Sequence, residues 1–242
     1  MSKIRIYIQP EKVENFIEIS GKNTIHKLRN VLRLGRKNEL FVFDGQGKEY
    51  LYAIKDISRK QISLKKVRES LKECFPEPKV ILAFPVTKEE KINFILQKAT
   101  ELGVSEFIPF TCQRSFKISS LSNKLMRWEK IVIEAARQSG RLWLPPVNNI
   151  LSFNKVIEKC YQVKLAASIK GDKLKSVLNT RQKEIFIIVG PEGDFTPAEW
   201  AKLRENNFKF IKLSINLLRM ETAAVFAAGL VNYFFNQDVY KT

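Results

Sequence analysis

The residues best suited to chemistry lie in two loops near the C-terminal end of the chain. One apolar run, residues 185–189, predicts a buried strand, and Gly190-Pro-Glu-Gly193 follows it directly. The other loop, residues 213–221, contains Arg219 and Glu221 and leads into a segment that predicts a helix over residues 222–235. Glycine lets the backbone approach a ligand closely, and α/β folds place their sites in loops that follow parallel strands. Both loops are therefore candidates for a functional site.

The Gly190-Pro-Glu-Gly193 turn does not match the common nucleotide-binding loops. No Gly-Lys-Ser/Thr follows it, and the GxGxxG spacing of dinucleotide sites is missing. A short glycine-rich turn with one carboxylate suits a ligand that combines a neutral ring with a cationic centre. S-adenosylmethionine, an adenosine joined to a sulfonium, fits this description. The same residues would also occur in a tight turn that needs glycine only for its geometry. The spacing alone does not distinguish such a turn from a cofactor-binding loop.

The segment 222–235 is apolar nearly all round. A helix of this kind is buried on more than one side. Either a second copy of the chain packs against it, or it is the central helix of a monomer. The sequence leaves both arrangements open.

The charge of the chain favours a polyanionic partner. The 242 residues carry a formal net charge of +17. Residues 1–72 hold 17 Lys and Arg against 8 Asp and Glu, a net of +9, so over half of the excess lies in under a third of the length. Such an asymmetry indicates nucleic acid ahead of membrane. A lysine-rich composition that follows the codon usage of a genome is the alternative explanation.

Metal-dependent and triad chemistry receive little support from the composition. The three cysteines, Cys74, Cys112 and Cys160, are widely spaced, and His26 is the single histidine. This pattern argues against a disulfide framework or a zinc site and nearly excludes a Ser-His triad. The sequence shows no signal-peptide pattern and no apolar window of membrane-spanning length. We therefore expect no metal, no membrane partner and a cytoplasmic location.

Two parts of the chain differ in pattern, with prolines at positions 76 and 78 marking the boundary between them. Upstream, short strand-like segments alternate, Asp44-Gly-Gln-Gly47 predicts a hairpin turn, and residues 23–34 predict a helix. Downstream, apolar strands alternate with helices, which predicts a parallel sheet with helices on both faces. We expect a small β-barrel over residues 1–72 and an α/β domain over residues 73–242.

Two helix starts carry capping-box signals. Thr87 is followed three residues later by Glu90, and Thr196 is followed by Pro197 and then by Glu199. Both patterns predict a helix that begins directly after the threonine.

Several cations are candidates for contacts with RNA. Arg29 and Arg33 are four residues apart and would share one face of a helix, where both could meet phosphates. Arg137 and Arg141 lie near the C-terminal end of a predicted helix, and Arg114 lies upstream. The helix dipole favours cations at that end in any case, so this cluster alone is weak evidence for binding.

Taken together, these motifs resemble the RsmE family of SPOUT-class RNA methyltransferases. The resemblance covers most of the chain, and its segments occur in the family's order: His26…Val31-Leu-Arg33, Gln97-Lys-Ala-Thr-Glu-Leu-Gly-Val104, Arg114-Ser115, Glu134-Ala-Ala-Arg-Gln-Ser-Gly-Arg141, Gly190-Pro-Glu-Gly193 and Leu218-Arg-Met-Glu-Thr-Ala223. It implies an N-terminal PUA-like RNA-binding barrel, a C-terminal domain whose end is threaded into a trefoil knot, and a homodimer formed through that domain. It also implies methylation of N3 of uridine 1498 in 16S ribosomal RNA, in the small subunit, with S-adenosylmethionine as donor.

Site residues follow from the same resemblance. Arg219 would stabilise the negative charge on the uracil edge, and Glu221 would accept the N3 proton, orient Arg219 or cap the final helix. The residues expected to hold the cofactor are Ser168, Val189, Gly190, Glu192, Gly193, Leu213, Ser214, Leu218, Thr222 and Ala223. The residues expected to contact RNA are Arg5, His26, Arg29, Arg33, Arg114 and Arg141.

Three positions depart from the family pattern. Asp194 stands where the family usually has a second glycine, and Ser214 and Asn216 replace a glycine and an arginine. Two other functions therefore stay open. One is a different SPOUT enzyme that methylates a ribose 2′-hydroxyl or another base. The other is a non-enzymatic rRNA-binding assembly factor that retains the fold.

Overall fold

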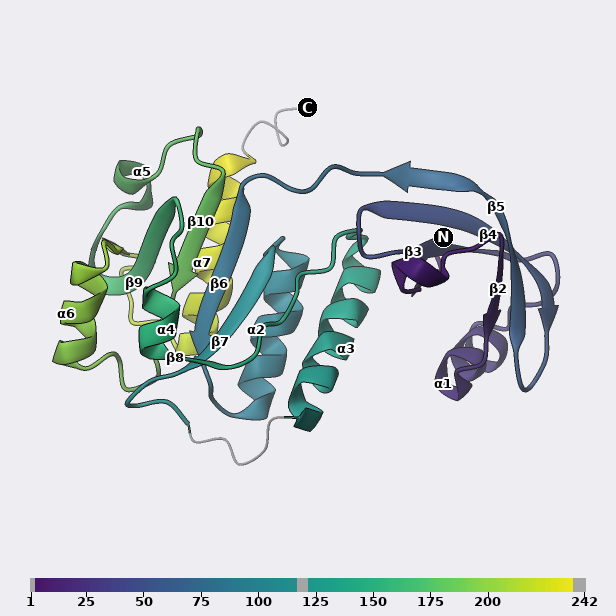
Figure 1. Ribbon diagram of the computed structural model, residues 1–242, viewed down its shortest axis with the longest axis horizontal. Helices are drawn as coiled ribbons and strands as arrows, with labels where there is room; N and C mark the ends of the chain where they lie inside the picture. Colours follow the sequence, from purple (N-terminus) through teal and green to yellow (C-terminus); the bar gives the residue numbers. More distant parts are fainter. Residues whose placement is uncertain (1–2, 117–121, 237–242) are drawn as a thin grey trace. The chain divides into compact units, whose positions relative to one another are not determined.

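A computed structural model describes residues 3–116 and 122–236 (Figure 1). The chain forms two compact units. Unit 1 comprises Met1–Phe75 and Ala136–Leu144, and unit 2 comprises Pro76–Ala135 and Pro145–Thr242. The boundary predicted at residue 72 left out the segment Ala136–Leu144, where the chain returns to unit 1. This return has a packing cause. Leu142 and Ala136 are fully or nearly fully buried in one apolar cluster with Phe43.

Unit 1 is built on a five-stranded sheet with the order β1-β3-β4-β5-β2. Its strands are β1 (Arg5–Tyr7), β2 (Phe16–Ile19), β3 (Glu39–Phe43), β4 (Lys48–Ile57) and β5 (Ile62–Lys72). β1 pairs parallel with β3, and the other neighbours pair antiparallel. Ile6 and Ile17 belong to opposite edge strands but share one core, so the sheet curls around it. The hairpin expected at residues 44–47 is confirmed between β3 and β4.

The helical part of unit 1 differs from the expectation. It consists of the 3-10 turn η1 (Pro10–Lys12), the short helix α1 (Lys22–Ile25) and the π-helix η2 (His26–Val31). Arg33 lies beyond the end of η2 and has a left-handed backbone with φ of 51°. The prediction that Arg29 and Arg33 share one helix face is therefore wrong, because the helix ends between them.

Unit 2 contains a six-stranded sheet with the order β11-β9-β10-β6-β7-β8. Its strands are β6 (Lys79–Pro85), β7 (Glu106–Thr111), β8 (Leu151–Ser152), β9 (Val163–Asp172), β10 (Glu184–Ile188) and β11 (Lys209–Ile211). All neighbouring strands pair parallel, which confirms the predicted parallel sheet. The sequence did not indicate β8, since two residues are too few to show a period.

Helices cover both faces of this sheet, as Figure 1 shows. The helices in this part of the chain are α2 (Glu89–Glu101), α3 (Ser122–Ser139), whose last turn belongs to unit 1, α4 (Phe153–Ile157), α5 (Leu174–Val177), α6 (Pro197–Glu205) and α7 (Met220–Phe235). On one face, Ile81 and Ala83 of β6 share a core with Phe153 of α4 and Leu203 of α6. Side chains alternate along a strand, so the intervening residues of β6 face the other side. There, α7 packs against β6 and beside α2. Within the described residues, no helix is long and apolar enough to cross a membrane.

One of the two capping predictions is confirmed. At the start of α6, Thr196 Oγ1 accepts from the Glu199 amide, and Glu199 Oε2 accepts from the Thr196 amide at 2.9 Å. The box predicted for Thr87 and Glu90 is wrong, because the N-cap of α2 is Lys88 and no side chain caps it. Thr87 Oγ1 instead donates to Glu192 Oε1 at 3.4 Å.

Candidate active site

A cavity of about 660 Å³ lies in unit 2 beside the ends of β9, β10 and β11. The second half of β9 and the loops after β10 and β11 supply most of its wall, with Lys91 from α2 and Met220 and Ala223 from α7. Most of the residues expected around the cofactor line it: Ser168, Val189, Gly190, Glu192, Gly193, Leu213, Ser214, Leu218 and Ala223. Arg219 lines it as well, whereas Thr222 and Glu221 do not. The fold therefore brings the two loops of interest to one cavity.

The loop after β10, residues 190–194, is a tight turn held by its own backbone. The Asp194 amide donates to the Pro191 carbonyl at 2.8 Å. A Cβ on Gly190 would lie 3.2 Å from Asp194 Oδ1 and from the Phe195 ring, so the packing leaves little room for any side chain. Asp194 itself has a left-handed φ of 62°, and its Oδ1 accepts from the Phe195 amide at 2.8 Å. The conformation that a glycine adopts readily is thus taken here by an aspartate.

The loop after β11, residues 213–219, presents an apolar tip and a cationic end. Ser214 Oγ accepts from the Asn216 amide at 3.1 Å, so this serine closes a local turn. Ile215 and Leu217 are 91% and 84% exposed. Arg219 is the N-cap residue of α7, with φ of −64° and ψ of 152°, and its side chain is exposed at the cavity. An exposed guanidinium at the cavity wall can reach a bound anion.

Lys91 also belongs to the site, although it was not among the residues predicted from the sequence. Its Nζ pairs with Glu192 Oε1 of the 190–194 loop and lies 3.4 Å from Glu221 Oε2 at the start of α7. The hydrogen bond from Lys91 holds the pKa of Glu192 below its ordinary value, and the same bond raises the pKa of Lys91. The carboxyl ends of parallel strands meet at one edge of a sheet. A lysine in the first turn of the helix after β6 was the signal that could have revealed this contact.

Arg114 lies next to the cavity loop. Its Nη1 donates to the Gly193 carbonyl at 2.6 Å, and a Cβ on Gly193 would lie 3.4 Å from Arg114 Cδ. The side chain is exposed, so a guanidinium borders the cavity.

The other candidate cations belong to unit 1 and differ in exposure. His26 and Arg33 are exposed, and Arg29 is half-buried. Burial lowers the pKa of Arg141 to about 10, and the nearby Glu73 opposes this shift. A pKa of about 10 keeps Arg141 charged at neutral pH.

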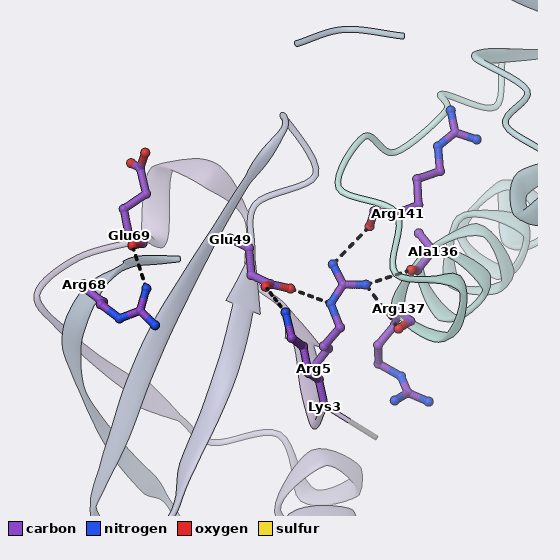
Figure 2. Close-up of polar contacts among 8 residues, drawn as sticks. All are labelled: Lys3, Arg5, Glu49, Arg68, Glu69, Ala136, Arg137 and Arg141. Atoms are coloured by element: carbon purple, nitrogen blue, oxygen red, sulfur yellow. Dashed lines mark hydrogen bonds and ion pairs between the residues drawn. The ribbon is translucent and has the colours of Figure 1, made fainter. Parts of the chain in front are cut away.

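Arg5 is a correction to the expected RNA-binding set. Its side chain is buried, and Nε donates to Glu49 Oε1 at 2.7 Å (Figure 2). Its Nη atoms donate to the carbonyls of Ala136, Arg137 and Arg141 at 3.3–3.4 Å. These contacts occupy the guanidinium, so Arg5 holds the second segment of unit 1 and its side chain is buried instead of exposed for an RNA contact.

No cluster of three or more metal-binding side chains occurs in the part of the chain that the structure describes. The cavity is lined by glycine turns, by apolar loop residues and by the charged groups Lys91, Glu192, Asp194 and Arg219.

Comparison with known proteins identifies the class to which this fold and site belong. A family model of an RNA methyltransferase domain matches residues 75–232, and a model of an RNA methyltransferase PUA domain matches residues 21–67.

Similar proteins narrow the class further. The Ribosomal RNA small subunit methyltransferase E of Rickettsia conorii is 34% identical over 237 residues, which cover 94% of each chain. That of Mesomycoplasma hyopneumoniae is 33% identical and covers 89% of this chain and 93% of its own. A crystal structure of the Neisseria gonorrhoeae protein of this name, bound to S-adenosyl methionine, matches with a TM-score of 0.88 and 28% identity over 97% of this chain and 98% of that one. The chain belongs to the ribosomal RNA small subunit methyltransferase E (RsmE) family.

Proposed function

We propose that this protein transfers the methyl group of S-adenosylmethionine to N3 of uridine 1498 in 16S ribosomal RNA. The observation that carries the proposal is the single cavity that unites the 190–194 loop, the 213–219 loop and Arg219. The similar protein from Neisseria gonorrhoeae binds S-adenosyl methionine. Membership of the RsmE family supports small-subunit rRNA as the substrate.

The residues around the cavity fit this cofactor. A volume of about 660 Å³ lies within the range that holds a ligand of its size. Leu213 and Leu218 offer apolar surface to a purine ring, and Gly190 lets the backbone approach it. Glu192 supplies a carboxylate suited to a sulfonium. When bound, the cofactor supplies an electrophilic methyl group.

The protein's own contribution is to prepare the uracil for attack. N3 carries a proton, so the base must lose it and the resulting anion must be stabilised. Arg219 has the charge and exposure for that role. The Glu221 carboxylate forms an ion pair with Lys91 Nζ at 3.4 Å, and Glu221 does not line the cavity. We therefore assign Glu221 to positioning, with water taking the proton. Because N3 lies on the Watson–Crick edge, the uridine must be unpaired.

Ribosomal RNA would be bound through cations of both units. His26, Arg29 and Arg33 lie in and directly after η2 of unit 1, and Arg114 borders the cavity of unit 2. Arg141 remains a candidate in spite of its partial burial. Phosphate contacts of this kind weaken steeply as salt is added. An enzyme with this substrate works where ribosomes are assembled, so we place it in the cytoplasm.

We further propose a homodimer and a knotted C-terminal end. Phe226 of α7 is 44% exposed, and Leu102 is 41% exposed. Leu102 packs against Gly229, which lies three residues after Phe226 on α7. A second copy of α7 would cover this face. The knotted end is proposed on the basis of membership of the RsmE family.

Product analysis tests the main proposal. The purified protein is incubated with methyl-labelled S-adenosylmethionine and unmodified small subunits, and the labelled nucleoside is identified after digestion of the RNA. We expect 3-methyluridine at one position. A labelled ribose or another base would indicate a different SPOUT enzyme. A protein that binds rRNA but neither binds the cofactor nor transfers label would be an assembly factor.

A further inference from the structure

We infer that Lys91 is a positioning residue that holds the Glu192 carboxylate at the cavity wall, and that this carboxylate makes the site prefer the charged methyl donor to its neutral product. The inference rests on the proposed function, because it requires that this cavity binds S-adenosylmethionine.

A gradient of burial runs through the three charged side chains. The exposed fraction is 14% for the Glu221 side chain, 24% for Lys91 and 54% for Glu192. Glu221 is fixed in the first turn of α7, and Lys91 Nζ lies 3.4 Å from its Oε2. The less exposed carboxylate, Glu221, thus anchors Lys91, and Lys91 holds the more exposed carboxylate of Glu192.

Apart from Lys91, few contacts hold the Glu192 side chain in this position. Its second described partner is Thr87, whose Oγ1 donates to Glu192 Oε1 at 3.4 Å, a long hydrogen bond. The 190–194 loop on which it stands is exposed at positions 192–194. Without the ammonium of Lys91, this side chain would turn to solvent, where water and salt screen its charge.

A carboxylate at the cavity wall distinguishes two related molecules. S-adenosylmethionine carries a sulfonium, whereas S-adenosylhomocysteine, the product after methyl loss, has a neutral thioether at the same atom. Attraction by Glu192 therefore acts on the donor and leaves the product nearly unaffected. A preference of this kind would favour release of the product in exchange for fresh donor.

The direction of the change in donor affinity after removal of Lys91 distinguishes a positioning role from a purely electrostatic one. Removing the ammonium from the cavity wall would by itself strengthen the binding of any cation. If Lys91 acts by holding Glu192, its removal weakens binding of the cationic donor instead.

The test is calorimetric titration of S-adenosylmethionine and S-adenosylhomocysteine into Lys91→Met, Glu192→Gln and the double variant. Each single change is expected to raise the Kd for S-adenosylmethionine about three- to tenfold, as loss of one exposed charge interaction allows. The Kd for S-adenosylhomocysteine should change less than about twofold. The double variant should be no weaker than either single variant, because both changes remove the same interaction.

Matched variants complete the design. Lys98→Met removes another ion-paired lysine of α2, which lies 3.0 Å from Glu101 and does not line the cavity, and both affinities should stay at the wild-type values. Lys91→Arg should restore most of the preference for the donor. If Lys91→Met does not fold, Glu192→Gln still tests the carboxylate, since its side chain is more than half exposed.

The outcomes are separable. Failure of the wild-type protein to bind S-adenosylmethionine would overturn the proposed function and this inference with it. Normal wild-type binding with tighter or unchanged donor binding in Lys91→Met would overturn the inference alone. An equal loss for donor and product would also overturn it, because Lys91 would then merely shape the cavity.

Discussion

Arg5 and Glu49 form an ion pair at 2.7 Å in which both side chains are almost fully buried, with exposed fractions of 6% and 2% (Figure 2). The guanidinium also lies over the Phe43 ring, 4.8 Å from its centroid. A second arginine–carboxylate pair of unit 1, Arg36 and Asp56, has the same 2.7 Å separation but exposed fractions of 73% and 50%. The two pairs therefore differ in burial and in the further contacts that Arg5 makes, and we compare them on that basis.

We expect Arg5→Met to lower the free energy of unfolding by about 3–5 kcal/mol, because it leaves the Glu49 carboxylate buried without its main partner. Three backbone carbonyls at 136, 137 and 141 also lose a donor. Urea denaturation followed by tryptophan fluorescence measures the change.

Arg36→Met is the control for this loss. Its pair is open to solvent, so its removal should alter stability far less. Equal losses in the two variants would show that neither burial nor the further contacts of Arg5 make its pair with Glu49 more important for stability.

Arg219→Ala should lower the rate of methyl transfer at saturating cofactor by about a hundredfold or more, because a charge that stabilises the developing anion is removed. The Kd for S-adenosylmethionine should change less than about twofold, because the other residues that line the cavity are unchanged. Single-turnover assays on small subunits and calorimetric titration measure the two quantities.

Arg204→Ala provides the matched control for this variant. Arg204 is an exposed arginine of α6 that lies over the Phe210 ring and does not line the cavity. Its removal should leave both quantities unchanged. Transfer at a near wild-type rate by Arg219→Ala would remove Arg219 from the mechanism.

Much of the architecture could be predicted because its signals are local. The run 185–189 is apolar since β10 is covered on both faces, and the Thr196 capping box needs only residues within one turn. Charged contacts between residues that lie far apart in the sequence were harder to predict. Arg5 resembles any surface cation in sequence, yet its partner Glu49 is 44 residues away. Lys91 and Glu192 are 101 residues apart, and only the parallel strand order places them together.

Asp194 offers a test of backbone strain in the 190–194 loop. A left-handed φ costs a non-glycine residue about 1 kcal/mol or more, and the Asp194 side chain offsets this with its bond to the Phe195 amide. Asp194→Gly loses the bond but removes the strain, so its stability should stay within about 0.5 kcal/mol of the wild type. Asp194→Ala loses the bond and keeps the strain, so it should be destabilised by about 1–2 kcal/mol. Urea denaturation of the cofactor-free protein compares them. Equal stability of the two variants would mean that the φ of 62° is not strained.

The three cysteines should differ in reactivity. Cys74 and Cys160 are exposed, whereas burial, followed by the charge of Glu199, raises the pKa of Cys112 to about 11. The thiolate is the reactive form, so at pH 8 about one Cys112 side chain in a thousand would be ionised. Titration of the native protein with Ellman's reagent at pH 8 should detect two thiols quickly and the third only after unfolding in guanidinium. Cys112→Ser should keep the two fast thiols and abolish the slow one. Three native thiols that react at similar rates would contradict the raised pKa, and with it the burial of the β7 end beside Glu199.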